Sequence, residues 1–146
     1  MKKLIKLIAL PVCLLLAVTV LVACVSGGGS AEKTEYDEWP TEVFAEVFTD
    51  FEFPALAGGT KYIVVNKAKS TDKCVIMLIV TGDVNINAYG GGMSSPLSNI
   101  GMFWNSTVNA YLKTSYTSGR TASFQYIKMA DGTLVLVYST YPNPTV

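Results

Sequence analysis

The apolar residues that follow the first forty positions are spaced as in a surface helix. Val43, Phe44, Val47 and Phe48 recur at i, i+1, i+4 and i+5, which predicts a helix over residues 40–49 with one apolar stripe. Glu42 and Glu46 lie on the other side of this helix. We therefore expect the stripe to pack on a sheet and the two glutamates to face water.

Two β-rich runs follow, at residues 62–65 and 74–80. The second run holds seven consecutive apolar residues, which predicts a central strand covered on both faces. Polar residues 66–73 separate the runs and predict a hairpin loop.

Residues 81–105 allow more than one interpretation. Residues 83–89 alternate like a strand but also suit a short helix, and Gly90–Gly92 interrupts the pattern. Ser95 and Pro96 then suit an N-cap and a first helical residue. Leu97, Ile100 and Trp104 would follow on one face of a helix that Gly101 weakens.

The last third alternates as a β-meander, with strands expected at 107–116, 121–129 and 133–140. Asp131-Gly132 is a hairpin signal, and Pro142 is expected to lie beyond the last strand. The predicted fold is a single α+β domain with the order α-β-β-α-β-β-β. It has an antiparallel sheet of about five strands and one or two short helices.

The chain begins with a different pattern. Lys2, Lys3 and Lys6 precede an apolar run over 7–23, and this run ends in Leu21-Val22-Ala23-Cys24. These four residues resemble the lipobox of bacterial lipoproteins. The resemblance implies that the Cys24 sulfur receives a diacylglycerol group and that a signal peptidase cuts before Cys24. It also implies that the new amine can be acylated with a fatty acid such as palmitate.

The resemblance divides the chain into three parts. Residues 1–23 would be a signal peptide, residues 24–38 a lipidated cysteine with a flexible Gly/Ser and acidic tether, and residues 39–146 the single domain. The protein would be anchored by lipid to the cell membrane or the outer membrane and would face outside the cytoplasm. An uncleaved signal anchor is the alternative, although this run of 17 residues, apolar apart from Thr19, is at the short limit for a span.

Composition narrows the chemistry. The 146 residues carry 11 Lys and Arg against 11 Asp and Glu, which argues against a nucleic-acid partner recruited by positive charge. The chain has no His, the commonest general base and metal ligand, and we expect neither a metal nor another cofactor. Cys74 begins an apolar run and is expected to be a buried hydrophobic residue.

Candidate binding residues are lysines and tyrosines. Lys67, Lys69 and Lys73 are expected to share the hairpin loop, where they either keep it soluble or contact anionic lipid or wall polymers. The numerous tyrosines, Tyr89 and Tyr111 among them, either border the core or form a surface that stacks on sugars or grips a peptide.

The domain also resembles small domains of unknown function on bacterial lipoproteins. The resemblance rests on Trp39-Pro40 before a helix, on Pro54 and Gly58-Gly59 before two strands, and on Gly101-Met102-Phe103 before the meander. It implies no established activity. Because no nucleophile and base can be paired, we expect a non-catalytic binding or structural module of the cell envelope, whose partner is an envelope protein or a wall polymer. The alternative is a His-free envelope enzyme acting on wall or surface polymers.

Overall fold

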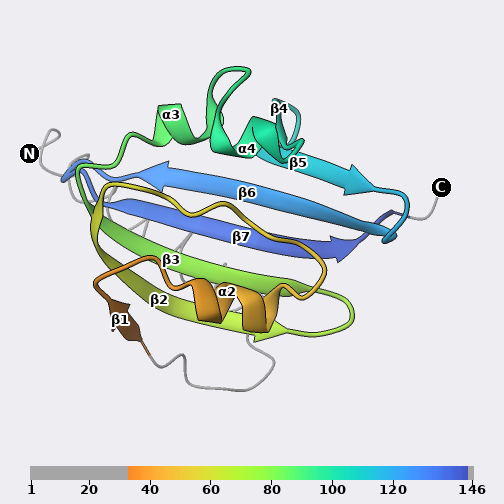
Figure 1. Ribbon diagram of the computed structural model, residues 1–146, viewed down its shortest axis with the longest axis horizontal. Coiled ribbons are helices and arrows are strands. Elements are labelled where there is room, and N and C mark those ends of the chain that lie inside the picture. The colour runs from red at the N-terminus through yellow and green to blue at the C-terminus, as the bar shows by residue number, and fades with distance from the viewer. Residues whose placement is uncertain (1–32, 145–146) are drawn as a thin grey trace, which may run out of the picture. The chain divides into compact units, whose positions relative to one another are not determined.

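The computed structural model describes residues 33–144, which form one antiparallel sheet with short helices (Figure 1). Within this range the sheet has seven strands in the order β1-β2-β3-β7-β6-β5-β4. The strands are β1 (Thr34–Tyr36), β2 (Gly59–Lys69), β3 (Cys74–Gly82), β4 (Phe103–Asn105), β5 (Ala110–Ser115), β6 (Arg120–Lys128) and β7 (Leu134–Pro142). The helices are α2 (Thr41–Val47), α3 (Ile86–Gly90) and α4 (Pro96–Asn99). The predicted α+β class is confirmed.

The hydrophobic core lies between one face of the sheet and the helices. Helix α2 buries Val43, Phe44 and Val47 and leaves Glu42 and Glu46 exposed, as its apolar stripe predicts. Figure 1 views the sheet from this side, with α2 and the segment after it crossing in front of the strands. The helix is shorter than the predicted span 40–49.

Aromatic rings fill the centre of this core. Tyr138 is fully buried, and its ring centroid lies 4.7 Å from that of Phe124 and 4.9 Å from those of Phe44 and Phe53. Trp39 packs edge-on to Tyr138 at 5.9 Å. These pairs connect α2 and the segment that follows it to β6 and β7 in one aromatic cluster.

Strand β3 is the central strand that its unbroken apolar run predicts, because it pairs with β2 on one side and with β7 on the other. Ile76 and Leu78 face the core cluster. Val75 and Met77 point to the opposite face of the sheet by strand alternation and are buried there. The prediction of burial on both faces is confirmed for this strand.

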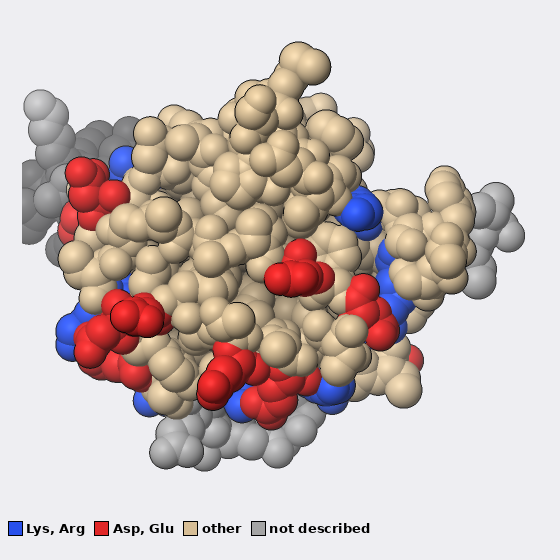
Figure 2. All heavy atoms as spheres, viewed as in Figure 1, with Lys and Arg blue, Asp and Glu red and all other residues tan. Residues whose placement is uncertain are grey.

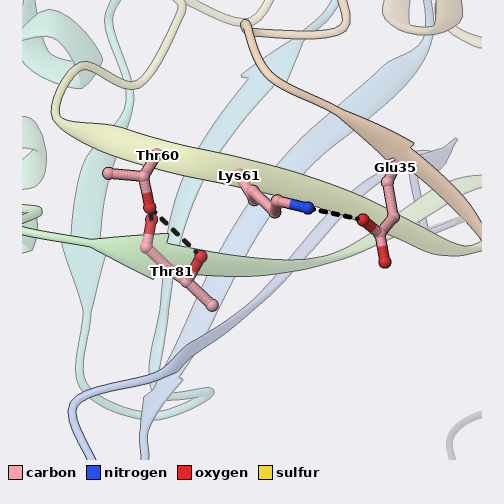
Figure 3. A network of polar contacts seen from close by, with 4 residues as sticks. All are labelled: Glu35, Thr60, Lys61 and Thr81. Atoms are coloured by element: carbon pink, nitrogen blue, oxygen red, sulfur yellow. Dashed lines mark hydrogen bonds and ion pairs between the residues drawn. The ribbon is translucent and has the colours of Figure 1, made fainter.

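The expected number of about five strands is wrong, since two three-residue edge strands extend the sheet. Strand β1 pairs with β2 and lies within residues 24–38, which the sequence assigns to a tether. Its Glu35 accepts a hydrogen bond from Lys61 Nζ of β2 at 3.0 Å (Figure 3). Next to Lys61, Thr60 of β2 forms hydrogen bonds with Thr81 of β3. The folded domain therefore begins before Trp39. Polar, exposed edge residues resemble a linker in sequence, and only pairing with β2 makes them a strand.

Other boundaries also differ from expectation. Of the two interpretations of residues 83–89, the short helix is the one that the structure shows over 86–90, where Asn85 Oδ1 accepts a hydrogen bond from Ala88 N at 3.1 Å and caps α3. Strand β5 begins at Ala110, not at residue 107. Pro142 does not lie beyond β7 as expected but is its last residue, opposite Arg120 in the register. A proline is tolerated there because its missing N–H removes no hydrogen bond from the interior of the strand.

The predicted signal peptide, the Cys24 lipidation site and most of the predicted tether lie outside the described residues. No helix within 33–144 has the length and apolar character needed to cross a membrane.

Candidate functional site

An uncharged surface covers one side of the domain. Residues 84–112 contain no Asp, Glu, Lys or Arg, and they form α3, α4, β4 and the start of β5. Figure 2 shows the result as a broad tan area over these elements, whereas red and blue side chains gather around α2 and the lower strands. A ligand that binds to this area meets hydroxyls, amides and rings rather than charges.

Large apolar side chains lie exposed in this area. Met93 is 97% exposed and Trp104 is 50% exposed, while the Tyr111 ring is half-buried beneath them. The Trp104 and Tyr111 rings meet edge-on with centroids 5.2 Å apart. We call Met93, Trp104 and Tyr111 the aromatic patch. They border a hollow of about 320 Å³ that is also lined by Ser98, Met102 and the backbone of Gly90–Gly92.

Strand pairing and a glycine hold the aromatic patch in place. Trp104 on β4 lies directly opposite Tyr111 on β5, which brings the two rings together on one face. A Cβ on Gly90 would lie 2.4 Å from Tyr111 Cζ, so the ring packs against bare backbone at the end of α3. The three glycines Gly90–Gly92 thus form a wall of the hollow.

The position of Trp104 corrects the sequence interpretation. Leu97, Ile100 and Trp104 do not share one helix, because α4 ends at Asn99. Gly101 has a φ of +79° and follows that end, and Met102 N donates back to Leu97 O at 2.9 Å. The chain turns there into β4, so Trp104 is half-exposed on an edge strand instead of joining a buried stripe. The predicted Ser95 cap is confirmed, since its Oγ accepts a hydrogen bond from Ser98 N at 3.3 Å.

Tyr89 and Tyr111 both pack against Phe124, with ring centroids 5.3 and 6.1 Å from that of Phe124. Tyr89 is only 3% exposed, and its hydroxyl donates to Pro54 O at 2.6 Å and accepts from the Tyr138 hydroxyl at 3.3 Å. Burial raises the pKa of Tyr89 far above its ordinary value of 10.0, so the phenol stays neutral. Tyr111 alone of this pair reaches the surface, and burial raises its pKa as well.

The three candidate lysines do not share a loop. Lys67 and Lys69 belong to β2, which extends to residue 69, and only Lys73 lies in the turn to β3. Lys67 Nζ pairs with Glu46 Oε2 at 2.8 Å, and Lys69 Nζ donates to Glu46 O at 2.8 Å. The hydrogen bond from Lys67 holds the pKa of Glu46 below its usual value. Two of the lysines thus fasten the last turn of α2 to the sheet.

Cys74 belongs to the core cluster, as its apolar run predicts, and its thiol donates to Ser70 O at 3.5 Å. Within residues 33–144, no three Cys, Asp or Glu side chains gather in a way that could hold a metal ion.

Comparison with known protein families, with curated proteins and with solved structures finds no match to this chain. The two resemblances to bacterial lipoproteins therefore rest on the sequence motifs alone and remain predictions.

Proposed function

We propose that this protein is a lipid-anchored, non-catalytic binding module of the cell envelope and that its aromatic patch binds a neutral wall glycan. The observation that carries the proposal is the half-exposed Trp104 ring, which is supported edge-on by Tyr111 and borders a hollow whose lining holds no charged residue. Contiguous exposed apolar patches with polar residues at their border are typical of binding sites.

The chemistry of the patch favours a sugar over a charged polymer. Indole and phenol rings present flat, electron-rich faces that suit the apolar C–H face of a sugar ring. Ser98 and the glycine backbone add polar groups at the border of the hollow. The volume of about 320 Å³ is at the small end of the range for ligand sites, which fits one or two sugar rings.

An extended peptide suits the same edge less well. Strand β4 offers only three residues for strand addition. It leads into a turn in which Asn105 Oδ1 accepts a hydrogen bond from Thr107 N at 3.0 Å. Very short edge strands are a common way of preventing the pairing of another chain.

The proposed anchor would keep the patch close to the membrane surface. Cys24 precedes the first described residue, Lys33, by nine positions. Nine fully extended residues span at most about 30 Å. A module on such a tether would sample wall polymers that lie next to the bilayer.

Sedimentation with purified, protein-free wall polysaccharide tests the glycan proposal. The processed protein extracted from membranes should sediment with the polymer, and Trp104→Ala should reduce the bound fraction at least about fivefold, as loss of a stacking ring does. Tyr116→Ala is the matched control, because Tyr116 is 92% exposed and lies outside the patch. Equal binding by both variants would refute the proposal. Release of soluble sugars from the polymer would favour the enzyme alternative.

The anchor is tested separately by intact-mass measurement of the membrane-bound protein. We expect a mature N-terminus at Cys24 that carries the mass of a diacylglycerol group. Cys24→Ala should accumulate as an unlipidated precursor. A mature N-terminus at any other residue would contradict the lipobox assignment.

A further inference from the structure

A second hollow lies on the helix side of the sheet and shares no lining residue with the hollow that the aromatic patch borders. It encloses about 260 Å³ between the end of the β5–β6 hairpin and residues Asp50 and Phe51. Ala122 and Thr140 are neighbours in the β6–β7 register and form part of its lining. Figure 1 shows the β5–β6 turn at the same end of the sheet as the start of the segment that follows α2.

Two cationic side chains line this hollow. Lys113 is on β5, where it lies opposite Ala122 of β6, and Arg120 is the first residue of β6. The ion pairs within residues 33–144 are Lys61–Glu35 and Lys67–Glu46, so neither of the two cations has a carboxylate partner in the described part of the chain. Lys113 Nζ instead lies 5.5 Å from the centroid of the Phe51 ring, which carries no net charge.

Arg120 is held in position by neutral acceptors. Its Nη1 donates to Thr71 O at 2.9 Å, and its Nη2 donates to Thr140 O at 3.0 Å and to Thr140 Oγ1 at 3.3 Å. These bonds fix the guanidinium without cancelling its charge. Arginine has five N–H donors, so its Nε–H and one Nη1–H are left for another acceptor. A guanidinium fixed in this way keeps its positive charge and can still donate single charge-assisted hydrogen bonds to an oxyanion.

The remaining lining defines what kind of anion fits. The hydroxyls of Ser115, Ser118 and Thr140 offer further polar contacts, and Asp50 is the one acid that lines the hollow. Two cations against one carboxylate leave a net charge of about +1, which balances a monoanion better than a dianion. A carboxylate such as Asp50 accepts hydrogen bonds, so it favours a ligand that also carries hydroxyl groups.

We propose that this hollow, the cationic pocket, is a second binding site that takes a monoanionic, hydroxyl-bearing ligand group through Lys113 and Arg120. A sugar carboxylate and a glycerol phosphodiester share this chemistry. The site shares no lining residue with the aromatic patch, so it does not depend on the glycan proposal.

Ligand-observed NMR on the processed protein in detergent tests the site with glucuronate, glycerophosphoglycerol and glucose. At least one of the two anions should bind. The anion that binds more tightly shows whether the ligand group is a sugar carboxylate or a glycerol phosphodiester. Glucose should not compete with it. Binding should weaken as salt is raised, because the contact is between charges near the surface. Displacement of the bound anion by glucose, or no binding of either anion, would overturn the proposal.

Variants then locate the site. Lys113→Gln should weaken anion binding by about tenfold, as loss of a charge-assisted hydrogen bond does. Lys128→Gln is the matched control, because Lys128 is an exposed lysine at the other end of β6 and should leave binding unchanged. Arg120→Lys keeps the charge but loses the planar guanidinium that bonds to Thr71 and Thr140. A thermal melt checks that this variant folds. Unchanged affinity in Lys113→Gln would overturn the assignment. Trp104→Ala should not affect anion binding, which separates the two sites.

Discussion

Phe124 is the side chain whose removal should damage the fold most clearly. It is fully buried on β6, and its ring contacts those of Tyr138 at 4.7 Å and Tyr89 at 5.3 Å. Phe124→Ala removes the ring from among four aromatic neighbours, and the surrounding rings can collapse into the cavity only in part. Substitutions of this kind cost about 3–5 kcal/mol. Because small domains have a total stability of about 5–15 kcal/mol, the loss would be a large share of it.

Urea unfolding followed by tryptophan fluorescence measures this loss. Trp39 is a suitable reporter, since it packs against Phe44 at 4.6 Å within the same core. With a urea m-value of about 1–3 kcal/mol per M, the midpoint should fall by about 2 M. Tyr116→Ala is the control, because its side chain is almost fully exposed and surface substitutions change stability by about 0.5 kcal/mol at most. A midpoint for Phe124→Ala that equals the control would refute the assignment of Phe124 to the centre of the core.

Three further predictions concern backbone, titration and thiol chemistry. Gly82 has a φ of +116°, and a Cβ there would meet backbone at 2.6 Å, whereas nothing would lie within 4 Å of a Cβ on Gly119. Gly82→Ala should therefore lower the melting temperature far more than Gly119→Ala. Equal shifts in melting temperature would contradict this account of Gly82. Burial raises the pKa of Tyr89 and Tyr138 above the ordinary value of 10.0, so the unfolded chain loses these protons first. The free energy of unfolding should therefore be intact below pH 10 and fall above it by up to about 1.4 kcal/mol per pH unit for each tyrosine. If the free energy of unfolding of a Tyr89→Phe, Tyr138→Phe double variant falls as steeply, the two tyrosines are not the cause. Cys74 is buried, so iodoacetamide should label it slowly in the native protein and rapidly in urea, as intact mass would show; fast native labelling would mean that Cys74 is accessible.

The elements that depend on local pattern could be predicted from the sequence. The helix stripe of Val43, Phe44 and Val47, the Ser95 cap and the central strand that begins at Cys74 all follow from side-chain periodicity or from one local hydrogen bond. The Asp131-Gly132 turn is of the same kind, since Asp131 Oδ1 accepts a hydrogen bond from Thr133 N at 2.9 Å. These features are decided within a few residues of the chain, so a single sequence contains them.

The tertiary structure decided what depends on distant partners. Strand β1 looks like a linker until it pairs with β2, and the length of β2 is set by pairing along the whole of β3. Trp104 and Tyr111 form a surface only because β4 and β5 pair in one register, and Gly90 leaves space for the ring. Lys113, Arg120 and Thr140 come from three strands and line one hollow only because those strands pair. Edge strands bury few apolar atoms and binding surfaces bury almost none, so neither produces the periodic pattern that marks a core element in the sequence.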